Sequence, residues 1–126
     1  LDGFNQARKR LAHRYFERLP RHPALVLPAN SDGHNWHMFC VCIDTEAIGT
    51  TRLEIQKRMG ADGIGTGIHY PAAHLFDLYK GYGYNEGDFP VAEQIGEQTL
   101  TLPLWPGMTE SDVGRVCESL DGILSR

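Results

Sequence analysis

Cysteine is scarce in this sequence, which contains three, Cys40, Cys42 and Cys117, among 126 residues. An odd number without a regular spacing argues against the disulfide framework that stabilises many small secreted domains. Cys40 and Cys42 lie two residues apart in an extended run, so their side chains point to the same face of a strand. We expect both to be small buried hydrophobic residues, because a reactive thiol needs a partly exposed, electropositive surrounding.

An excess of positive charge is missing as well. The formal net charge is −4, which gives no general affinity for nucleic acid. One basic cluster, Arg8-Lys9-Arg10 with Arg14 and Arg18, lies in a helical pattern, and we expect a solvated helix face rather than a phosphate-binding arm. No apolar run approaches the ~20 residues of a membrane-spanning helix, and no signal-peptide pattern opens the chain. We therefore expect a cytoplasmic protein with neither nucleic acid nor a membrane as partner.

The length fits one domain with a modest core. A hydrophobic content of 41% and a charged content of 22% are ordinary for a globular protein. The chain begins with Leu1 and lacks an initiator methionine. We expect it to be a fragment of a longer protein.

Helical and extended patterns alternate along the chain without an internal repeat. Helices are indicated by apolar spacings of three and four, by Pro20 after the first of them, and by Thr109 with Asp112, a relative of the capping box, before the last. The second helical pattern ends near Met59, and we expect Asp62-Gly63 to stop it. Expected helices cover residues 4–19, 50–59, 72–80, 90–98 and 109–124, and expected strands cover 36–44, 100–104 and part of the glycine-rich stretch 63–74.

Strand 36–44 is apolar on both faces, which predicts a central strand covered on both sides by this domain or by a neighbour. The short connections favour an α+β (two-layer α/β) domain over a doubly wound fold. We expect a small antiparallel or mixed sheet of three to four strands packed on helices that lie on one side.

The glycine-rich stretch has the composition of a binding edge. Gly63, Gly65 and Gly67 alternate, so the backbone there needs positive φ or room for a close approach. His69 and Tyr70 follow, and each can either satisfy local backbone groups or face a polar ligand. The stretch lacks the full Gly-x-Gly-x-x-Gly pattern and precedes an extended segment, so we do not expect a dinucleotide site.

Two groups of histidines could begin a metal site. They are His34 and His37 with Asp32, and His69 with His74. Neither pair of histidines has a convincing third partner at a fixed spacing, and neither pair lies at i,i+4 on an expected helix. We therefore predict no metal site.

Several motifs in one order resemble a known family. They are Arg10 with Tyr15; His34 and Trp36-His37 before a strand; residues 52–59 followed by Gly63-Ile64-Gly65-Thr66-Gly67-Ile68-His69-Tyr70-Pro71; Phe89-Pro90-Val91-Ala92-Glu93; and residues 102–109. This set resembles the C-terminal small domain of the DegT-type nucleotide-sugar aminotransferases, which are pyridoxal-phosphate enzymes of fold type I. The sequence departs from the commoner Pro-x-His continuation at Pro71-Ala72-Ala73-His74, and this form is similar to the branch that aminates a 4-keto pentose on uridine diphosphate in lipid A modification.

The resemblance implies a two-step amino transfer, usually from glutamate, to a keto sugar of a nucleotide-sugar in cell-envelope or natural-product sugar biosynthesis. It implies pyridoxal 5′-phosphate as cofactor, a homodimer, and residues 1–126 as the small domain. The family's Schiff-base lysine belongs to its large domain, and Lys9, Lys57 and Lys80 lack the family's surrounding sequence. This chain alone is therefore expected to be inactive.

The resemblance also implies which residues face the substrate: His69 and Tyr70 first, then His74 and His34. A purely structural role stays open for all four, since Tyr70 and His34 could simply pin the glycine-rich edge to the sheet. A second possible function is a non-catalytic binding module that kept the small-domain fold. A severed domain should self-associate through the apolar patch it exposes, whereas such a module should be monodisperse.

Overall fold

A three-stranded antiparallel sheet forms the centre of the computed structural model, which describes residues 1–125. The strands lie in the order β1 (Leu25–Val26), β2 (Phe39–Ile43) and β3 (Thr99–Leu102), so β2 is central as predicted. β3 begins one residue before the expected strand and ends before Pro103, which has no N–H to donate to a ladder. The prediction of a small α+β domain is confirmed.

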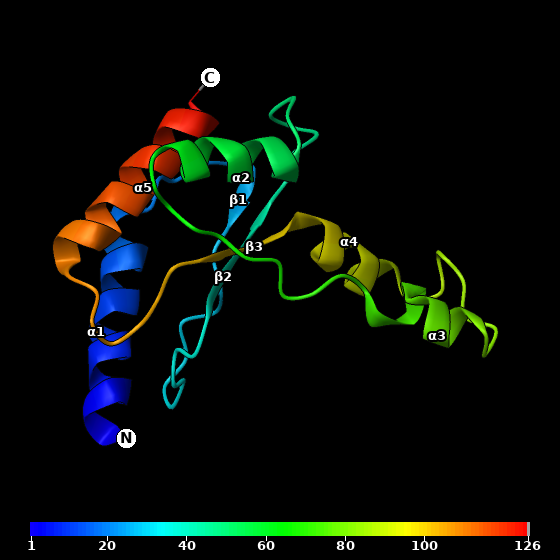
Figure 1. The fold of residues 1–126 in the computed structure, drawn as a ribbon, viewed down its shortest axis with the longest axis horizontal. Helices are drawn as coiled ribbons and strands as arrows, with labels where there is room; N and C mark the ends of the chain where they lie inside the picture. Colours follow the sequence, from blue (N-terminus) through cyan, green and yellow to red (C-terminus); the bar gives the residue numbers. More distant parts are fainter. Residues whose placement is uncertain (126) are drawn as a thin grey trace.

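The helices are α1 (Asp2–Arg18), α2 (Arg52–Ala61), α3 (Asp77–Lys80), α4 (Pro90–Gln98) and α5 (Glu110–Leu124), as Figure 1 shows. A complete capping box of Thr109 and Asp112 opens α5 as the sequence indicated. The single helix expected over 72–80 is wrong. A 3-10 helix (Ala73–Leu75) and the short α3 are separated by Phe76, whose extended backbone (φ −68°, ψ 144°) interrupts the helical path.

The end of α2 turns the chain into the glycine-rich stretch. Gly63 has φ of +75°, its N–H donates to Gly60 O (3.0 Å), and the Ile64 N–H donates to Met59 O (2.9 Å). This is the Schellman pattern, in which a residue without a Cβ satisfies the last helical carbonyls. The helix therefore stops at Asp62-Gly63 as predicted. The strand expected in the glycine-rich stretch is reduced to one bridge, Gly67 with Thr101.

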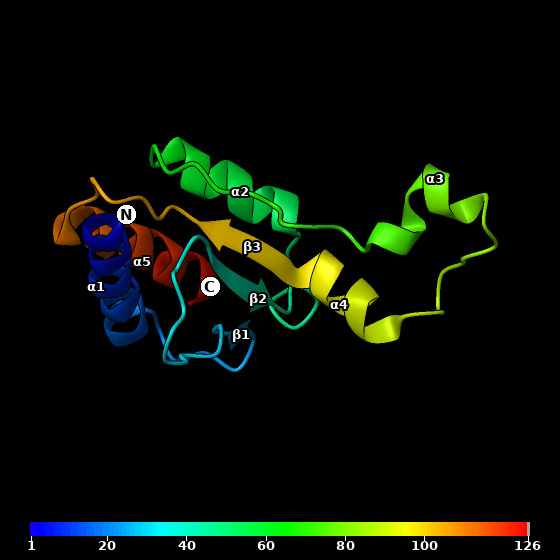
Figure 2. The same cartoon turned by 90° about the horizontal axis from the view of Figure 1, so that it is seen from below.

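The core lies between one face of the sheet and the helices α1, α2 and α5 (Figure 2). It contains Leu11 and Tyr15 of α1, Ile55 and Met59 of α2, Phe39, Val41 and Ile43 of β2, Leu100 and Leu102 of β3, and Val113, Val116 and Leu120 of α5. Tyr15 donates its hydroxyl hydrogen to Pro103 O (2.7 Å), and burial raises the pKa of this phenol above its ordinary value. Helices thus share one side of the sheet, as expected.

The opposite face of the sheet is less covered than predicted. We name it the outer face; it carries Cys40 and Cys42 of β2 and their cross-strand partners Thr101 and Thr99 of β3. Cys40 and Cys42 are half-buried, so the expectation of two buried cysteines is wrong. The reason is that α1, α2 and α5 pack on the other face. Burial, and then the neighbouring Cys40, raise the pKa of the Cys42 thiol.

Residues 70–98 form an extension that we call the arm, which projects away from the sheet and the core helices (Figures 1 and 2). Its base is fixed where α4 meets the chain before the 3-10 helix: a Cβ added at Gly96 would lie 2.6 Å from the Ala72 nitrogen. Arg52 also reaches from α2 and donates to the carbonyl oxygens of Gly96 (2.6 Å) and Thr99 (3.2 Å), which satisfies the end of α4.

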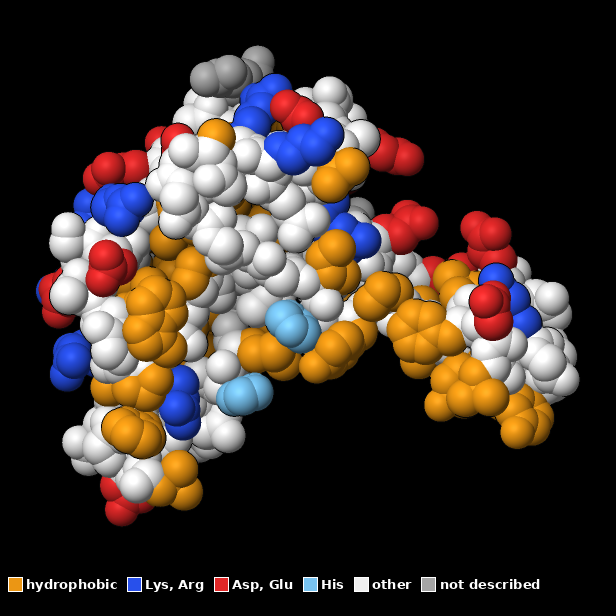
Figure 3. All heavy atoms as spheres, viewed as in Figure 1, with side chains coloured by type: hydrophobic (Ala, Val, Ile, Leu, Met, Phe, Trp, Pro, Cys, Tyr) orange, Lys and Arg blue, Asp and Glu red, His pale blue; other side chains and the backbone are white. Residues whose placement is uncertain are grey.

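Large apolar side chains are concentrated on the arm. Figure 3 shows many of them on the projecting part of the molecule. The exposed ones are Tyr70, Phe76, Leu78, Tyr79, Tyr82, Tyr84, Phe89, Val91 and Ile95. Such a concentration exceeds what single scattered surface residues explain and marks a surface suited to contact with another protein part. No helix within residues 1–125 has the length and apolar character needed to cross a membrane.

Candidate functional site

His69 lies at the outer face of the sheet, where the glycine-rich stretch meets β3. The Gly67 N–H donates to Thr101 O (3.0 Å) and the Thr101 N–H donates to Gly67 O (2.8 Å). This backbone pair places His69 Nδ1 2.8 Å from Thr101 Oγ1. Cys40 Sγ lies 3.2 Å from the same oxygen, so three side chains form one hydrogen-bonded row.

The ring of His69 explains the glycine at position 67. A Cβ added to Gly67 would lie 2.7 Å from Cε1 of His69 and 3.2 Å from its Nδ1. Real Cβ atoms do not approach so closely, so any side chain there displaces the ring. The alternating glycines predicted either positive φ or room for a close approach, and at Gly67 the imidazole of His69 makes a close approach.

Tyr70 stands beside His69 with its ring edge-on, at a centroid distance of 4.9 Å and an interplanar angle of 88°. Tyr70 is 67% exposed, whereas His69 is half-buried. The two residues that the sequence placed first are therefore neighbours at the surface. One ring nitrogen of His69 has a local partner, the side-chain hydroxyl of Thr101, and contact of the ring with a ligand stays a prediction.

His74 has a different environment, at the base of the arm. It is buried, and its Nε2 lies 2.8 Å from Glu93 Oε1 of α4. The same carboxylate accepts from the N–H groups of Gly87 (2.9 and 3.0 Å) and Phe89 (3.2 Å). Burial alone acts to raise the pKa of Glu93, but these two N–H groups and His74 outweigh it and lower that pKa. The contacts tie loop 81–89 to α4, and ligand binding by His74 stays a prediction.

His34 lies in the loop before β2, and its partners are separate from those of His69. It is exposed, and its ring stacks on Trp36 at a centroid distance of 4.1 Å. Its Nδ1 accepts from the Trp36 N–H (2.9 Å), which helps to hold Trp36 at a positive φ of 51°. These contacts order the loop. Over residues 1–125, no three His, Cys, Asp or Glu side chains gather closely enough to hold a metal ion.

Sequence reasoning missed Thr101 and the role of Glu93. The signal for Thr101 was available in the expected strand 100–104, where it is the one polar residue. Leu100 and Leu102 point to the core, so the side chain of Thr101 between them must point to the opposite face. The signal for Glu93 was its place three residues after Pro90 at the start of a helix, where a carboxylate can accept from free N–H groups.

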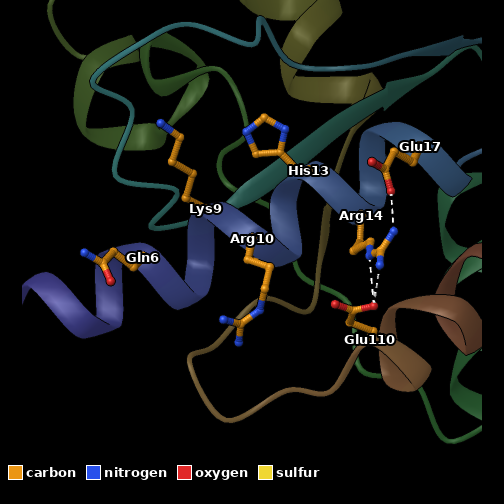
Figure 4. A pocket seen from close by; sticks show the side chains of 7 residues that line it. All are labelled: Gln6, Lys9, Arg10, His13, Arg14, Glu17 and Glu110. Carbon is orange, nitrogen blue, oxygen red and sulfur yellow. Dashed lines mark hydrogen bonds and ion pairs between the residues drawn. The ribbon is translucent and has the colours of Figure 1, made fainter.

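A hollow of about 660 Å³ lies on α1, in the basic cluster (Figure 4). It is lined by Gln6, Lys9, Arg10, His13, Arg14, Glu17 and Glu110. Figure 4 shows Arg14 directed at both acidic residues, at 2.7 Å from Glu17 and 2.7 Å from Glu110. These ion pairs are those of a solvated helix face, as predicted, and we do not place the functional site there.

The lysines among the described residues do not match what a pyridoxal-phosphate site needs. Such a site needs a lysine that is removed from water and held near the cofactor's carbonyl. Lys9, Lys57 and Lys80 are all exposed and lie on three different helices, α1, α2 and α3. No step of cofactor chemistry can therefore be assigned to the residues of this chain.

Comparisons with known proteins agree on one family. The family model of the DegT/DnrJ/EryC1/StrS aminotransferases matches residues 1–121. The spore coat polysaccharide biosynthesis protein SpsC of Bacillus subtilis (strain 168) is 35% identical over 128 residues, an alignment that covers 98% of this chain and 33% of SpsC.

Solved structures give the same result. DesV of S. venezuelae, solved in complex with a ketimine intermediate, superposes with a TM-score of 0.88 at 31% identity, covering 99% of this chain and 33% of DesV. The aminotransferase TlmJ from Streptoalloteichus hindustanus gives a TM-score of 0.82 at 29% identity, with the same coverage of 99% and 33%. The chain thus spans about a third of the length of these relatives. It belongs to the DegT/DnrJ/EryC1/StrS aminotransferase family.

Proposed function

We propose that this chain is the C-terminal small domain of an enzyme that transfers an amino group to a keto sugar carried on a nucleotide. The observation that carries the proposal is the family match over residues 1–121, which includes the whole glycine-rich edge and β3. SpsC is named as a spore coat polysaccharide biosynthesis protein, and DesV was solved with a ketimine, a species in which a C=N bond takes the place of a ketone C=O. Both descriptions fit amino transfer to a sugar.

The proposal assigns pyridoxal 5′-phosphate and its lysine to a large domain outside this chain. It is supported by the coverage of only 33% of each relative and by the exposure of all three lysines here. The cofactor supplies the electron sink for moving nitrogen between carbons, and the surrounding protein supplies position and proton transfer. Glutamate as donor, a homodimer and a cytoplasmic location complete the proposal, as the family resemblance implies.

The part of this chain in catalysis is to complete one wall of the substrate cleft. His69 and Tyr70 lie side by side at the outer face and offer an imidazole and an aromatic ring with a hydroxyl. This pair suits a ligand with a flat base and oxygen-rich groups, which a nucleotide-linked sugar has. His74 and His34, which have partners of their own, act more indirectly by ordering the arm and the loop before β2.

The test uses the intact protein that carries this chain, incubated with glutamate and a nucleotide-linked 4-keto sugar. We expect an aminated sugar nucleotide and one 2-oxoglutarate per amino group transferred. The His69→Ala variant should lose most of this activity, whereas His13→Ala, a histidine exposed on α1, should keep it. Absence of amino transfer with all keto sugars and donors, together with retained binding of a sugar nucleotide, would instead favour the non-catalytic binding module.

A further inference from the structure

Thr101 and Cys40 lie behind His69 and have no role in the function proposed above. Thr101 Oγ1 is 2.8 Å from His69 Nδ1 and 3.2 Å from Cys40 Sγ. We propose that these two residues are positioning residues that hold His69 as the neutral tautomer with the proton on Nε2, so that His69 donates a hydrogen bond to an oxygen of the ligand. The ligand's identity rests on the proposed function, but the tautomer does not.

The direction of the hydrogen bonds follows from counting donors. A thiol is a weak donor and its sulfur a weak acceptor, whereas a hydroxyl has one hydrogen and two lone pairs. If Cys40 donates to Thr101 and Thr101 donates to Nδ1, every hydrogen in the row has an oxygen or nitrogen partner. In the reverse order Nδ1–H donates to Thr101, the hydroxyl donates to sulfur, and the thiol hydrogen has no partner in the row. In a third arrangement Thr101 Oγ1 accepts from both Nδ1–H and the thiol, and the hydroxyl hydrogen then has no partner in the row. The first order is therefore favoured, and it leaves the ring proton on Nε2.

The ring is also held in place from two other sides. Gly67 lies against the ring, since a Cβ added there would be 2.7 Å from Cε1, and the Tyr70 ring lies perpendicular to it at 4.9 Å between centroids. Nε2 has no hydrogen-bond partner among residues 1–125. Every buried side-chain nitrogen or oxygen of those residues does have a partner. Nε2 therefore reaches the surface. A fixed N–H donor there suits a phosphate, carbonyl or hydroxyl oxygen and disfavours a ligand N–H group.

The next cross-strand pair on the outer face supplies a matched control. Thr99 pairs with Cys42 as Thr101 pairs with Cys40, on the same face and the same two strands. Among the described residues, no side-chain hydrogen bond joins Thr99 to a histidine, so Thr99→Val makes the same chemical change without touching the row. Thr101→Ser keeps the hydroxyl, and Thr101→Val removes it at nearly the same volume.

The first measurement is the ¹⁵N spectrum of the His69 ring in the labelled intact protein, taken at about pH 9, above the range in which histidines ordinarily titrate. We expect one protonated nitrogen, assigned to Nε2, and one bare nitrogen, Nδ1. The Thr101→Val spectrum should move toward the averaged values of two exchanging tautomers, while Thr101→Ser and Thr99→Val should match the parent spectrum. A parent spectrum with the proton on Nδ1, or no change in Thr101→Val, overturns the proposal.

The second measurement is the affinity of the intact protein for uridine diphosphate. We expect Thr101→Val to bind roughly fivefold to tenfold more weakly, as loss of an oriented hydrogen bond does, and Thr101→Ser to recover the parent affinity. Equal affinity of the Thr101→Val and parent proteins contradicts a positioning role. If the parent protein does not bind uridine diphosphate although the Nε2 tautomer is present, uridine diphosphate is not the ligand and the tautomer assignment stands. Failure of the proposed function itself is read from the amino-transfer assay.

Discussion

At the scale of single residues, Gly67 is the position on which the candidate site depends most directly. We predict that Gly67→Ala keeps the fold but pushes the His69 ring off Thr101, because its Cβ would lie 2.7 Å from Cε1. Nucleotide affinity of the intact protein should fall by about tenfold. Gly65→Ala is the control, since nothing lies within 4 Å of its added Cβ. An equal loss of affinity in both variants would show that the glycine is needed for its backbone freedom and not to make room for the His69 ring.

Glu93 gives a pH dependence whose sign follows from its lowered pKa. A depressed carboxyl pKa stabilises the folded state above the ordinary value, and this contribution disappears as pH falls through the folded-state pKa. We predict that Glu93→Gln is less stable than the parent chain near neutral pH and that the difference shrinks below about pH 4, under the ordinary value for glutamate. Urea denaturation at a series of pH values measures this. A difference that stays constant down to acid pH contradicts the assignment.

At the scale of elements, the contact between α4 and the chain at Ala72 fixes the base of the arm. We predict that Gly96→Ala destabilises the chain by about 1–3 kcal/mol, because the added Cβ would lie 2.6 Å from a backbone nitrogen that cannot move aside cheaply. Gly122→Ala in α5, where nothing lies within 4 Å, should stabilise by about 0.5–1 kcal/mol. Urea denaturation compares the two, and stabilisation by both variants would mean that α4 is free to shift.

The elements that the sequence predicted well are those with local chemical signals. The Thr109 capping box and the stop at Asp62-Gly63 depend on neighbours in the chain, so spacing alone reveals them. The errors lie where distant contacts decide. Apolar residues on both faces of β2 predicted that both faces would be covered. Instead, all three core helices pack on one face and leave Cys40 half-buried.

The candidate site divides in the same way. Adjacent His69 and Tyr70 follow a glycine-rich turn, so their shared position was predictable from the sequence. The partner of His69 was not, because Thr101 is 32 residues away and reaches it only through the antiparallel bridge at Gly67. His34 and His74 were grouped with His69 by their resemblance to family motifs, but the structure gives them separate partners, Trp36 and Glu93.

At the scale of the whole molecule, the arm predicts how the isolated chain behaves. Its exposed aromatic and aliphatic side chains should drive self-association once the rest of the enzyme is absent. Sedimentation should show a mass that rises with concentration above the 14.1 kDa of one chain. Replacing Leu78 and Val91 of the arm by serine should reduce this association.

Leu53→Ser is the matched control, because Leu53 is similarly exposed (60%) but lies on α2, outside the arm. Its association should equal that of the parent chain. A monodisperse 14.1 kDa species at every concentration would favour the free-standing binding module over the domain of a larger enzyme.

The central claim is that this chain is one domain of a pyridoxal-phosphate enzyme. It is tested most directly by the intact mass of the native gene product, followed on the same sample by its visible absorption spectrum. We predict a product much heavier than 14.1 kDa that absorbs as a pyridoxal Schiff base does. A native product of 14.1 kDa without that absorption would contradict the claim and leave the binding module as the function of this fold.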